Sequence, residues 1–274
     1  MSKKKLWIIL SAIIAVCVIA AAVLICVFVF GDGNSSGSGG NGGGGTEDND
    51  IQYDFDIKGT VGLLLVDQTA KLPQSASFTS ENTSVAKVDA NGVVTAVGIG
   101  ETVIVAKCSD GSEIRYTILV AATLHEAEFS VPETTKAAFV CADGCIVVGE
   151  YAAVPVYLVN NPGVSGFSLH LSYDSRLFTV KAVGPASDGV DSLQFTDDSE
   201  GNLHIMGLSH VINGIKEEEN ALFYLYFATN EGKSTGSSEL TLSMEAGDML
   251  VSVENGSEVT VDAEVYHGSI QTVK

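Results

Sequence analysis

The chain has 274 residues and a formal net charge of −20, a length that allows about one to three domains. Such an acidic surface repels phosphate backbones, which argues against nucleic-acid binding. It is typical of an exported, well-solvated protein, and it would attract cationic or calcium-bearing partners.

The N-terminal residues predict a membrane anchor. Residues 1–5 form a short basic tail with Lys3, Lys4 and Lys5, and residues 6–30 are uncharged and mostly apolar. As a helix this run would be about 37 Å long, enough to cross a hydrocarbon core of about 30 Å with some tilt. It ends in Val and Phe rather than in the small residues of a cleavage site. We therefore expect an uncleaved single-pass transmembrane helix with the N-terminus inside and the rest extracellular; a cleaved export signal is the alternative.

Residues 31–50 read as a linker. They are rich in Gly and Ser and end in an acidic stretch, GDGNSSGSGGNGGGGTEDND. Such a composition cannot bury a core and is typical of a flexible spacer.

Residues 51–124 predict a small all-β sandwich. Short alternating runs at 85–89, 93–97, 102–106 and 113–120 are separated by turn residues, and the Asn91-Gly92 pair is a strong hairpin signal. SVAKVD at 84–89, NGVVTA at 91–96 and GIG at 98–100 together resemble a group 2 bacterial immunoglobulin-like domain. The resemblance implies an extracellular spacer or adhesion module without catalytic chemistry.

Residues 137–274 also read as β throughout, with about nine strands, which suits a second β-sandwich. The run from 166 to 173 alternates, so that Phe167, Leu169 and Leu171 face one side while Ser168 and His170 face the other. The fold class is therefore all-β, with two β-sandwich domains after one N-terminal transmembrane helix.

The second domain resembles a cohesin, the receptor half of the cohesin–dockerin pair. The motifs that carry the resemblance are VVGE at 147–150, VPV at 154–156, NPGVSGF at 161–167, LSYD at 171–174 and HGSI at 267–270. It implies a nine-stranded, jelly-roll-like sandwich on a bacterial cell surface and a dockerin-containing protein as partner. Calcium is expected on the dockerin, and no cofactor is expected on this chain.

The resemblance also implies which face binds the partner. It places the dockerin on the strand of residues 166–173, and we expect the strand of residues 221–227 beside it, with two tyrosines facing outward. The family often has an acidic or amide pair at positions that are Gly166 and Ser168 here, which leaves the cohesin type open. The predicted partner-binding residues are Gly166, Ser168, His170, Ser172, Gly207, Ser209, His210, Leu222, Tyr224 and Tyr226.

Catalytic and metal signatures are not found in the sequence. The spacing of His125, His170, His204, His210 and His267 matches no zinc motif, and no nucleophile elbow, phosphate loop or cofactor fingerprint occurs. We therefore predict a non-enzymatic protein with no metal site. Cys141 and Cys145 could close a small disulfide loop in an oxidising exterior, and two free thiols are the alternative.

The sequence thus predicts a membrane-anchored surface cohesin that binds dockerin-bearing proteins, such as polysaccharide-degrading enzymes. A carbohydrate-binding or adhesion module on the same fold is the alternative, and a purely structural envelope protein is a third reading. The only tryptophan, Trp7, lies in the predicted anchor. The outer domains are therefore poorly equipped for a sugar-binding platform, which favours a protein partner and only an indirect link to polysaccharide.

Overall fold

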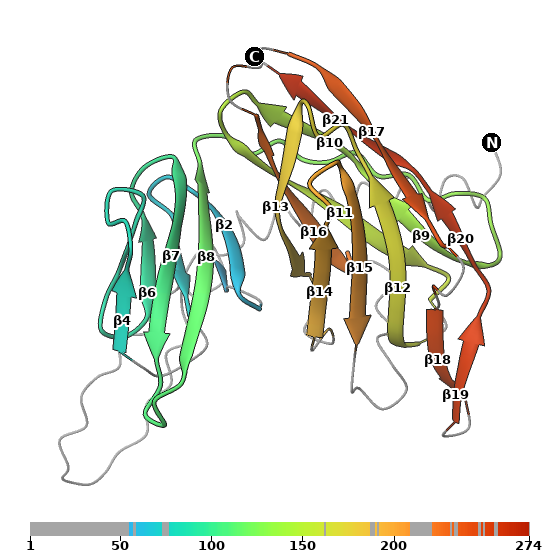
Figure 1. Ribbon diagram of the computed structural model, residues 1–274, viewed down its shortest axis with the longest axis horizontal. Helices are drawn as coiled ribbons and strands as arrows, with labels where there is room; N and C mark the ends of the chain where they lie inside the picture. Colours follow the sequence, from blue (N-terminus) through green and yellow to red (C-terminus); the bar gives the residue numbers. More distant parts are fainter. Residues whose placement is uncertain are drawn as a thin grey trace, which may run out of the picture. The chain divides into compact units, whose positions relative to one another are not determined.

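The computed structural model describes residues 55–56, 59–72, 77–161, 163–186, 190, 192–208, 221–230, 232, 235–245, 248, 250–254 and 257–273. The predicted basic tail, transmembrane helix and linker lie outside these residues. Within the described ranges, no helix has the length and apolar character needed to cross a membrane. Residues 51–274 form one compact unit, and the regular elements named in it are β-strands (Figure 1). The all-β prediction is confirmed for this part of the chain.

The first β-sandwich is built from two four-stranded sheets with the orders β1-β3-β6-β5 and β2-β8-β7-β4. Its strands are β1 (Phe55–Asp56), β2 (Val61–Leu65), β3 (Thr69–Lys71), β4 (Ser77–Ser80), β5 (Ala86–Val88), β6 (Val93–Ala96), β7 (Gly100–Lys107) and β8 (Glu113–Ala121). The hairpin predicted at Asn91-Gly92 joins β5 to β6, and Gly92 has a φ of 80°, which glycine adopts without strain. Alternating side chains such as Leu64, Tyr116 and Ile118 fill the space between the sheets.

The second sandwich pairs two larger sheets. The front sheet has the order β10-β21-β17-β12-β15-β14, with the hairpin of β18 and β19 attached to β12, and the back sheet has the order β13-β16-β11-β9-β20. The strands are β9 (Ala137–Cys141), β10 (Asp143–Val147), β11 (Tyr151–Val159), β12 (Val164–Ser172), β13 (Phe178–Pro185), β14 (Ser192–Asp197), β15 (Asn202–Leu208), β16 (Phe223–Thr229), β17 (Ser237–Ser243), β18 (Leu250–Glu254), β19 (Ser257–Val261), β20 (Ala263–Tyr266) and β21 (Gly268–Val273). This sandwich has more strands than the nine predicted. One reason is that β18 and β19 form an additional hairpin, in which β18 also pairs with β12.

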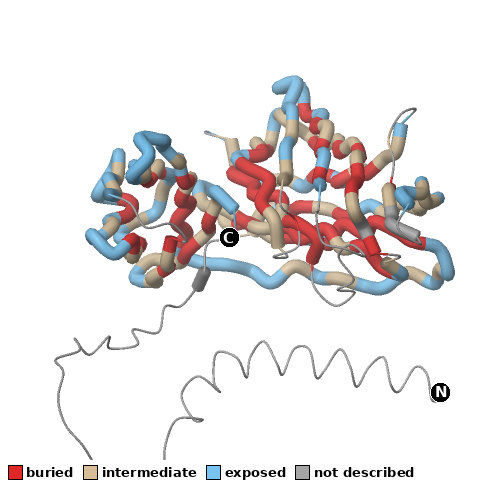
Figure 2. The backbone as a smooth tube through the Cα atoms, turned by 90° about the horizontal axis from the view of Figure 1, so that it is seen from below, coloured by how far each residue is buried: buried red, intermediate tan, exposed pale blue. Residues whose placement is uncertain are grey.

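The core of the second sandwich lies between the two sheets, where inward side chains of both interdigitate. Phe167 of β12 and Phe223 of β16 stack across the gap with ring centroids 5.7 Å apart, and Phe223 is fully buried. Burying one such ring stabilises the fold by roughly 1.5–3 kcal/mol. Figure 2 shows buried residues along the strands, with exposed residues mostly in the connections.

The last two strands pair with the first two strands of this sandwich. Strand β20 pairs in parallel with β9 in the back sheet, and β21 pairs in parallel with β10 in the front sheet. Residues near position 140 and residues near position 270 are therefore neighbours in both sheets, although they lie far apart in the sequence.

Candidate functional site

The outward face of strands β14, β15 and β12 forms the candidate site. These three strands are antiparallel neighbours in the front sheet, with β15 in the middle of the group (Figure 1). Their inward side chains, such as Leu169 and Ile205, belong to the core. The outward side chains line a hollow of about 600 Å³. The residues that line it are Gly166, Phe167, Ser168, His170, Ser192, Gln194, His204, Met206, Leu208, Asp248 and Val251.

Two histidines lie at the centre of this hollow. His170 of β12 and His204 of β15 are directly opposite each other in the strand register. Cross-strand partners of this kind place their side chains side by side on one face. The two imidazole rings are accordingly stacked, with centroids 4.4 Å apart and planes inclined by only 10°.

Asp248 completes the cluster from the segment between β17 and β18. Its Oδ2 lies 2.8 Å from Nδ1 of His170, and its Oδ1 lies 3.3 Å from Nε2 of His204. The Asp248 side chain is only 4% exposed, whereas the two histidines are about one-third exposed. The carboxylate therefore lies beneath the imidazole pair, and the rings form the accessible surface.

Hydrogen bonds keep Asp248 ionised despite its burial. Burial alone would raise the pKa of Asp248, but the Glu245 amide and the side chains of His170 and Ser168 donate hydrogen bonds that outweigh it and lower the pKa. The Glu245 nitrogen is 2.8 Å from Oδ2. The cluster thus places a carboxylate with a lowered pKa next to the two imidazole rings.

An apolar rim borders the cluster on β15. Met206 is 39% exposed and Leu208, the last residue of β15, is 63% exposed, which is high for large apolar side chains on a strand that is paired on both sides. Leu208 is opposite Gly166 of β12 and Ser192 of β14 in the register. The small neighbours leave both flanks of the leucine open.

The predicted strand of residues 166–173 has the expected orientation. Ser168 and His170 line the hollow, and Gly166 lies at its edge beside Leu208. Ser172 is half-buried on the same strand, paired with Asn202 and Thr241. Ser209 and His210 lie outside the described residues.

Two of the predicted partner-binding residues face the core instead. The prediction that Leu222 faces outward is wrong: its amide donates to the Val156 carbonyl, and its side chain is 3% exposed within the core. Gly207 is buried as well, because the ring of Phe167 lies across it. A Cβ at position 207 would lie 2.2 Å from that ring, so the glycine provides space for a core aromatic.

The two tyrosines of β16 are the largest correction. We predicted β16 beside β12, but β16 lies in the back sheet between β13 and β11. Tyr224 and Tyr226 do point away from the core, as the alternation predicted, but Tyr226 is only 8% exposed. Both tyrosines belong to an apolar cluster that includes Leu119 of the first sandwich. They are therefore remote from the hollow and covered.

Cys141 and Cys145 are free thiols in the structure, so the possible disulfide between them does not form. Cys141 is buried in the core at the end of β9, whereas Cys145 of β10 accepts a hydrogen bond from the Gln271 side chain of β21. The two sulfur atoms therefore lie in different surroundings, one in the core and one beside the Gln271 side chain. Burial raises the pKa of the Cys141 thiol to about 12, which keeps it protonated and unreactive at neutral pH.

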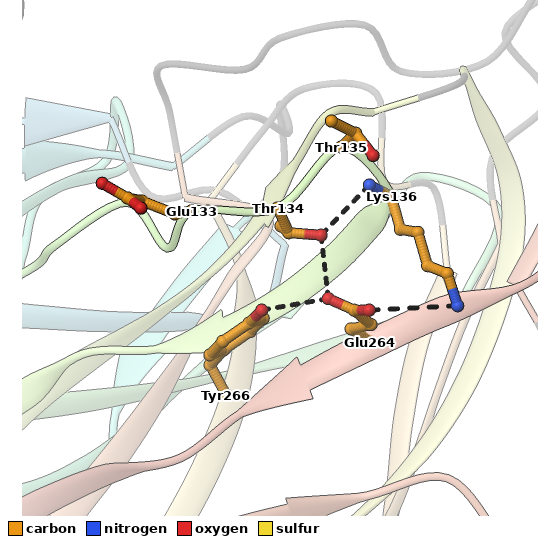
Figure 3. A pocket seen from close by; sticks show the side chains of 6 residues that line it. All are labelled: Glu133, Thr134, Thr135, Lys136, Glu264 and Tyr266. Atoms are coloured by element: carbon orange, nitrogen blue, oxygen red, sulfur yellow. Dashed lines mark hydrogen bonds and ion pairs between the residues drawn. The ribbon is translucent and has the colours of Figure 1, made fainter.

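A second hollow borders β20 and the segment that leads into β9 (Figure 3). Thr134 Oγ1 and the Tyr266 hydroxyl both donate to Glu264 Oε2, at 2.8 and 2.9 Å, and the Lys136 ammonium lies 3.9 Å from Oε1. The hydrogen bonds from Thr134 and Tyr266 lower the pKa of Glu264. These groups mainly satisfy one another, and we interpret them as a structural connection between two segments.

Of the eleven residues that line the hollow, the sequence prediction named three and missed eight. Among the eight are His204, Met206, Leu208 and Asp248. The alternation of residues 203–208 does contain a signal, because buried Leu203 and Ile205 leave His204, Met206 and Leu208 facing outward. Asp248 had no signal of this kind, since it lies on an irregular segment far from both histidines in sequence.

A family model described as the intimin immunoglobulin-like domain matches residues 74–111, and no curated protein matches the chain. The match agrees with an immunoglobulin-like domain and does not test the assignment to group 2.

Several solved structures that resemble about half of the chain are cohesins. A type I cohesin from Pseudobacteroides cellulosolvens is 18% identical, with a TM-score of 0.43, covering 50% of this chain and 92% of that one. A non-cellulosomal cohesin from the archaeon Archaeoglobus fulgidus is 24% identical, with a TM-score of 0.39, covering 51% and 92%.

A cohesin–dockerin complex of type I from Clostridium thermocellum is 18% identical, with a TM-score of 0.41, covering 50% of this chain and 99% of that one. The structures named here are cohesins, and the immunoglobulin-like match lies within the first sandwich.

Proposed function

We propose that residues 137–274 are a cohesin-type binding module that takes a dockerin-bearing protein on the outward face of β14, β15 and β12. The observation that carries this proposal is the pair of exposed apolar side chains, Met206 and Leu208, beside the hollow of that face. Exposed large apolar side chains that gather on one face, with polar residues around them, are typical of surfaces that a partner covers. Polar groups around them, such as Ser168 and Gln194, offer the hydrogen bonds that fix orientation.

The chemistry of the face favours a protein over a sugar. Among its described residues the exposed rings are the two histidines, and the tyrosines that could have stacked on sugars lie in the covered cluster of the back sheet. A stacked imidazole pair above a buried carboxylate is a polar feature suited to hydrogen bonds. Carbohydrate binding remains the other outcome of the test below.

We further propose that the chain is held at a bacterial cell membrane by residues 6–30, with the binding module outside. Support comes from the uncharged apolar run behind three lysines and from the linker that follows. In this arrangement the chain would collect dockerin-bearing enzymes that act on polysaccharides, without any chemistry of its own. Fractionation of the producing cells should recover the full chain in the membrane fraction, and a soluble secreted form would overturn this part.

The binding proposal can be tested by capture from the secreted proteins of the producing organism. The bait is residues 51–274, which form one compact unit. We expect the wild-type bait to retain dockerin-bearing proteins, and Leu208→Asp to weaken retention at least about tenfold, as for a hot-spot residue. Val131→Asp is the matched control, since Val131 is 62% exposed but lies outside the face.

Chelation distinguishes the possible ligands. If the captured proteins are released by a chelator and are bound again when calcium alone is added, they carry a dockerin, because a dockerin needs that ion. Retention of the bait on cellulose or xylan without any captured protein would move the function to sugar binding. Equal losses for Leu208→Asp and Val131→Asp would show that the proposed face is not the binding surface.

A further inference from the structure

We propose that His170, His204 and Asp248 form a binding site for a divalent transition-metal ion of the zinc class. One ligand atom from each residue can be chosen so that all three lie within 4.8 Å of one another. The three residues come from β12, from β15 and from the segment between β17 and β18, so the fold assembles a set of ligands that no sequence spacing reveals. The proposal concerns this chain alone and stands whether or not the face binds a dockerin.

The distances suit an ion between the three side chains. Bonds of about 2.0–2.1 Å in a tetrahedral arrangement separate two ligand atoms by roughly 3.3–3.4 Å. His204 Nε2 and Asp248 Oδ1 are 3.3 Å apart, which is already that separation. His170 Nδ1 and Asp248 Oδ2 are 2.8 Å apart and share a hydrogen bond. An ion would take the place of the shared proton once this pair moves apart by about half an ångström. The two rings, whose planes are now inclined by only 10°, would also have to tilt so that both nitrogen lone pairs meet at the ion.

A buried nitrogen without a hydrogen-bond partner points to the same place. Nε2 of His204 is inaccessible to solvent, and no hydrogen bond reaches it from the residues that the structure describes. It does face Asp248 Oδ1, but without hydrogen-bond geometry. Buried polar atoms in folded proteins nearly always have a partner. A metal ion bound between this nitrogen and the carboxylate would satisfy both.

Neighbouring groups hold the Asp248 carboxylate in one orientation. The Glu245 amide and the Ser168 side chain both bond to Asp248 and fix its orientation. Groups that hold a ligand in this way contribute strongly to metal affinity. The carboxylate would therefore need little rearrangement on binding an ion.

The ligand types select the class of ion. Two imidazole nitrogens with one carboxylate oxygen suit zinc and similar ions, whereas calcium and magnesium prefer oxygen ligands. Three protein ligands also leave one coordination position open. Since the two histidines are about one-third exposed in the hollow, water or a group from a bound partner could fill that position.

The proposal can be tested by titrating zinc into chelator-treated residues 51–274 and measuring the heat of binding by isothermal titration calorimetry. We expect one zinc ion per chain and no competition from calcium. Loss of an outer-shell partner typically weakens metal binding 10–100-fold, so removal of a direct ligand should weaken it by more than about 100-fold. His204→Phe is the first variant, because it keeps a ring to stack on His170 and removes only the nitrogen.

His125→Gln is the matched control, because His125 is exposed and lies on the segment between the two sandwiches. His170→Gln is a second ligand variant, and the melting temperature of each metal-free variant reports folding. Zinc should raise the melting temperature of the wild type and of His125→Gln but not that of the two ligand variants. Absence of stoichiometric binding, or unchanged affinity in both ligand variants, would overturn the site.

Discussion

Strands β15 and β16 both carry large side chains that point away from the core, yet only those of β15 are open to solvent. Leu208 on β15 is 63% exposed, whereas Tyr226 on β16 is 8% exposed. The alternation of apolar and polar residues predicts an outward orientation for both side chains equally. The difference arises from what covers each sheet: the cluster of Tyr224 and Tyr226 includes Leu119, which is distant in sequence. Outward orientation therefore identifies a docking candidate only when the covering segments are also known.

The strongest test of this contrast is Tyr226→Ala. Because the ring is buried within an apolar cluster, we expect a loss of about 3 kcal/mol in the free energy of unfolding, near the values for other aromatic truncations. Urea unfolding of residues 51–274, followed by far-ultraviolet circular dichroism, measures it; the only tryptophan lies outside this segment. A loss below about 0.5 kcal/mol would mean that the tyrosine is in fact open to solvent.

Gly207→Ala tests the inward side of β15. Its Cβ would lie 2.2 Å from the Phe167 ring, so the ring must move and the core is overpacked. We expect a loss of about 1–3 kcal/mol in the free energy of unfolding. Gly166→Ala is the matched control on β12, since its Cβ would meet only the end of the Leu208 side chain at 3.1 Å. Equal losses for the two variants would contradict the assignment of Gly207 to the core.

Alkaline pH should separate a buried phenol from an exposed one. Burial raises the pKa of Tyr226, so the folded state favours the neutral phenol. This contribution is fully present below the unfolded pKa of about 10 and is lost as the pH rises above it. We expect the free energy of unfolding to fall between about pH 10 and pH 11. Tyr226 should contribute at most about 1.4 kcal/mol per pH unit to this fall, and Tyr226→Phe should remove that contribution. An unchanged slope in that variant would argue against a buried hydroxyl.

Met206→Ala should have the smallest effect on folding. Because Met206 is 39% exposed on the proposed docking face, we expect the free energy of unfolding to change by less than about 0.5 kcal/mol. Binding of a dockerin-bearing partner, measured by calorimetry, should nevertheless weaken. A large loss of stability together with unchanged binding would reverse the roles that we assign to β15 and β16.

Local patterns account for much of the fold but only part of the site. The run predicted at residues 113–120 lies within β8, and the Asn91-Gly92 hairpin joins β5 and β6. Both depend on neighbouring residues, where periodicity and turn chemistry act directly. The placement of β16 in the back sheet depends on which strands pair, and alternation within one strand carries no information on that.

The histidine cluster shows the same limit for the site. His170 was predicted on the outward face, and its cross-strand partner His204 follows only from the register of β12 against β15. Asp248 reaches the two rings from an irregular segment. Metal motifs recognised by spacing presuppose ligands on one element or loop. A site assembled from three separated segments becomes visible only in three dimensions.

The parallel pairing of β10 with β21 has a consequence for how this sandwich would respond to a pulling force. Five residue pairs, from Asp143↔Ser269 to Val147↔Val273, align these two strands in the same direction. A pull on the N-terminal end of β10 against the C-terminal end of β21 would load their hydrogen bonds in shear, so that the bonds share the force. In a perpendicular pull they would break one after another. Tension applied across these two ends would therefore meet the pairing in its more resistant direction.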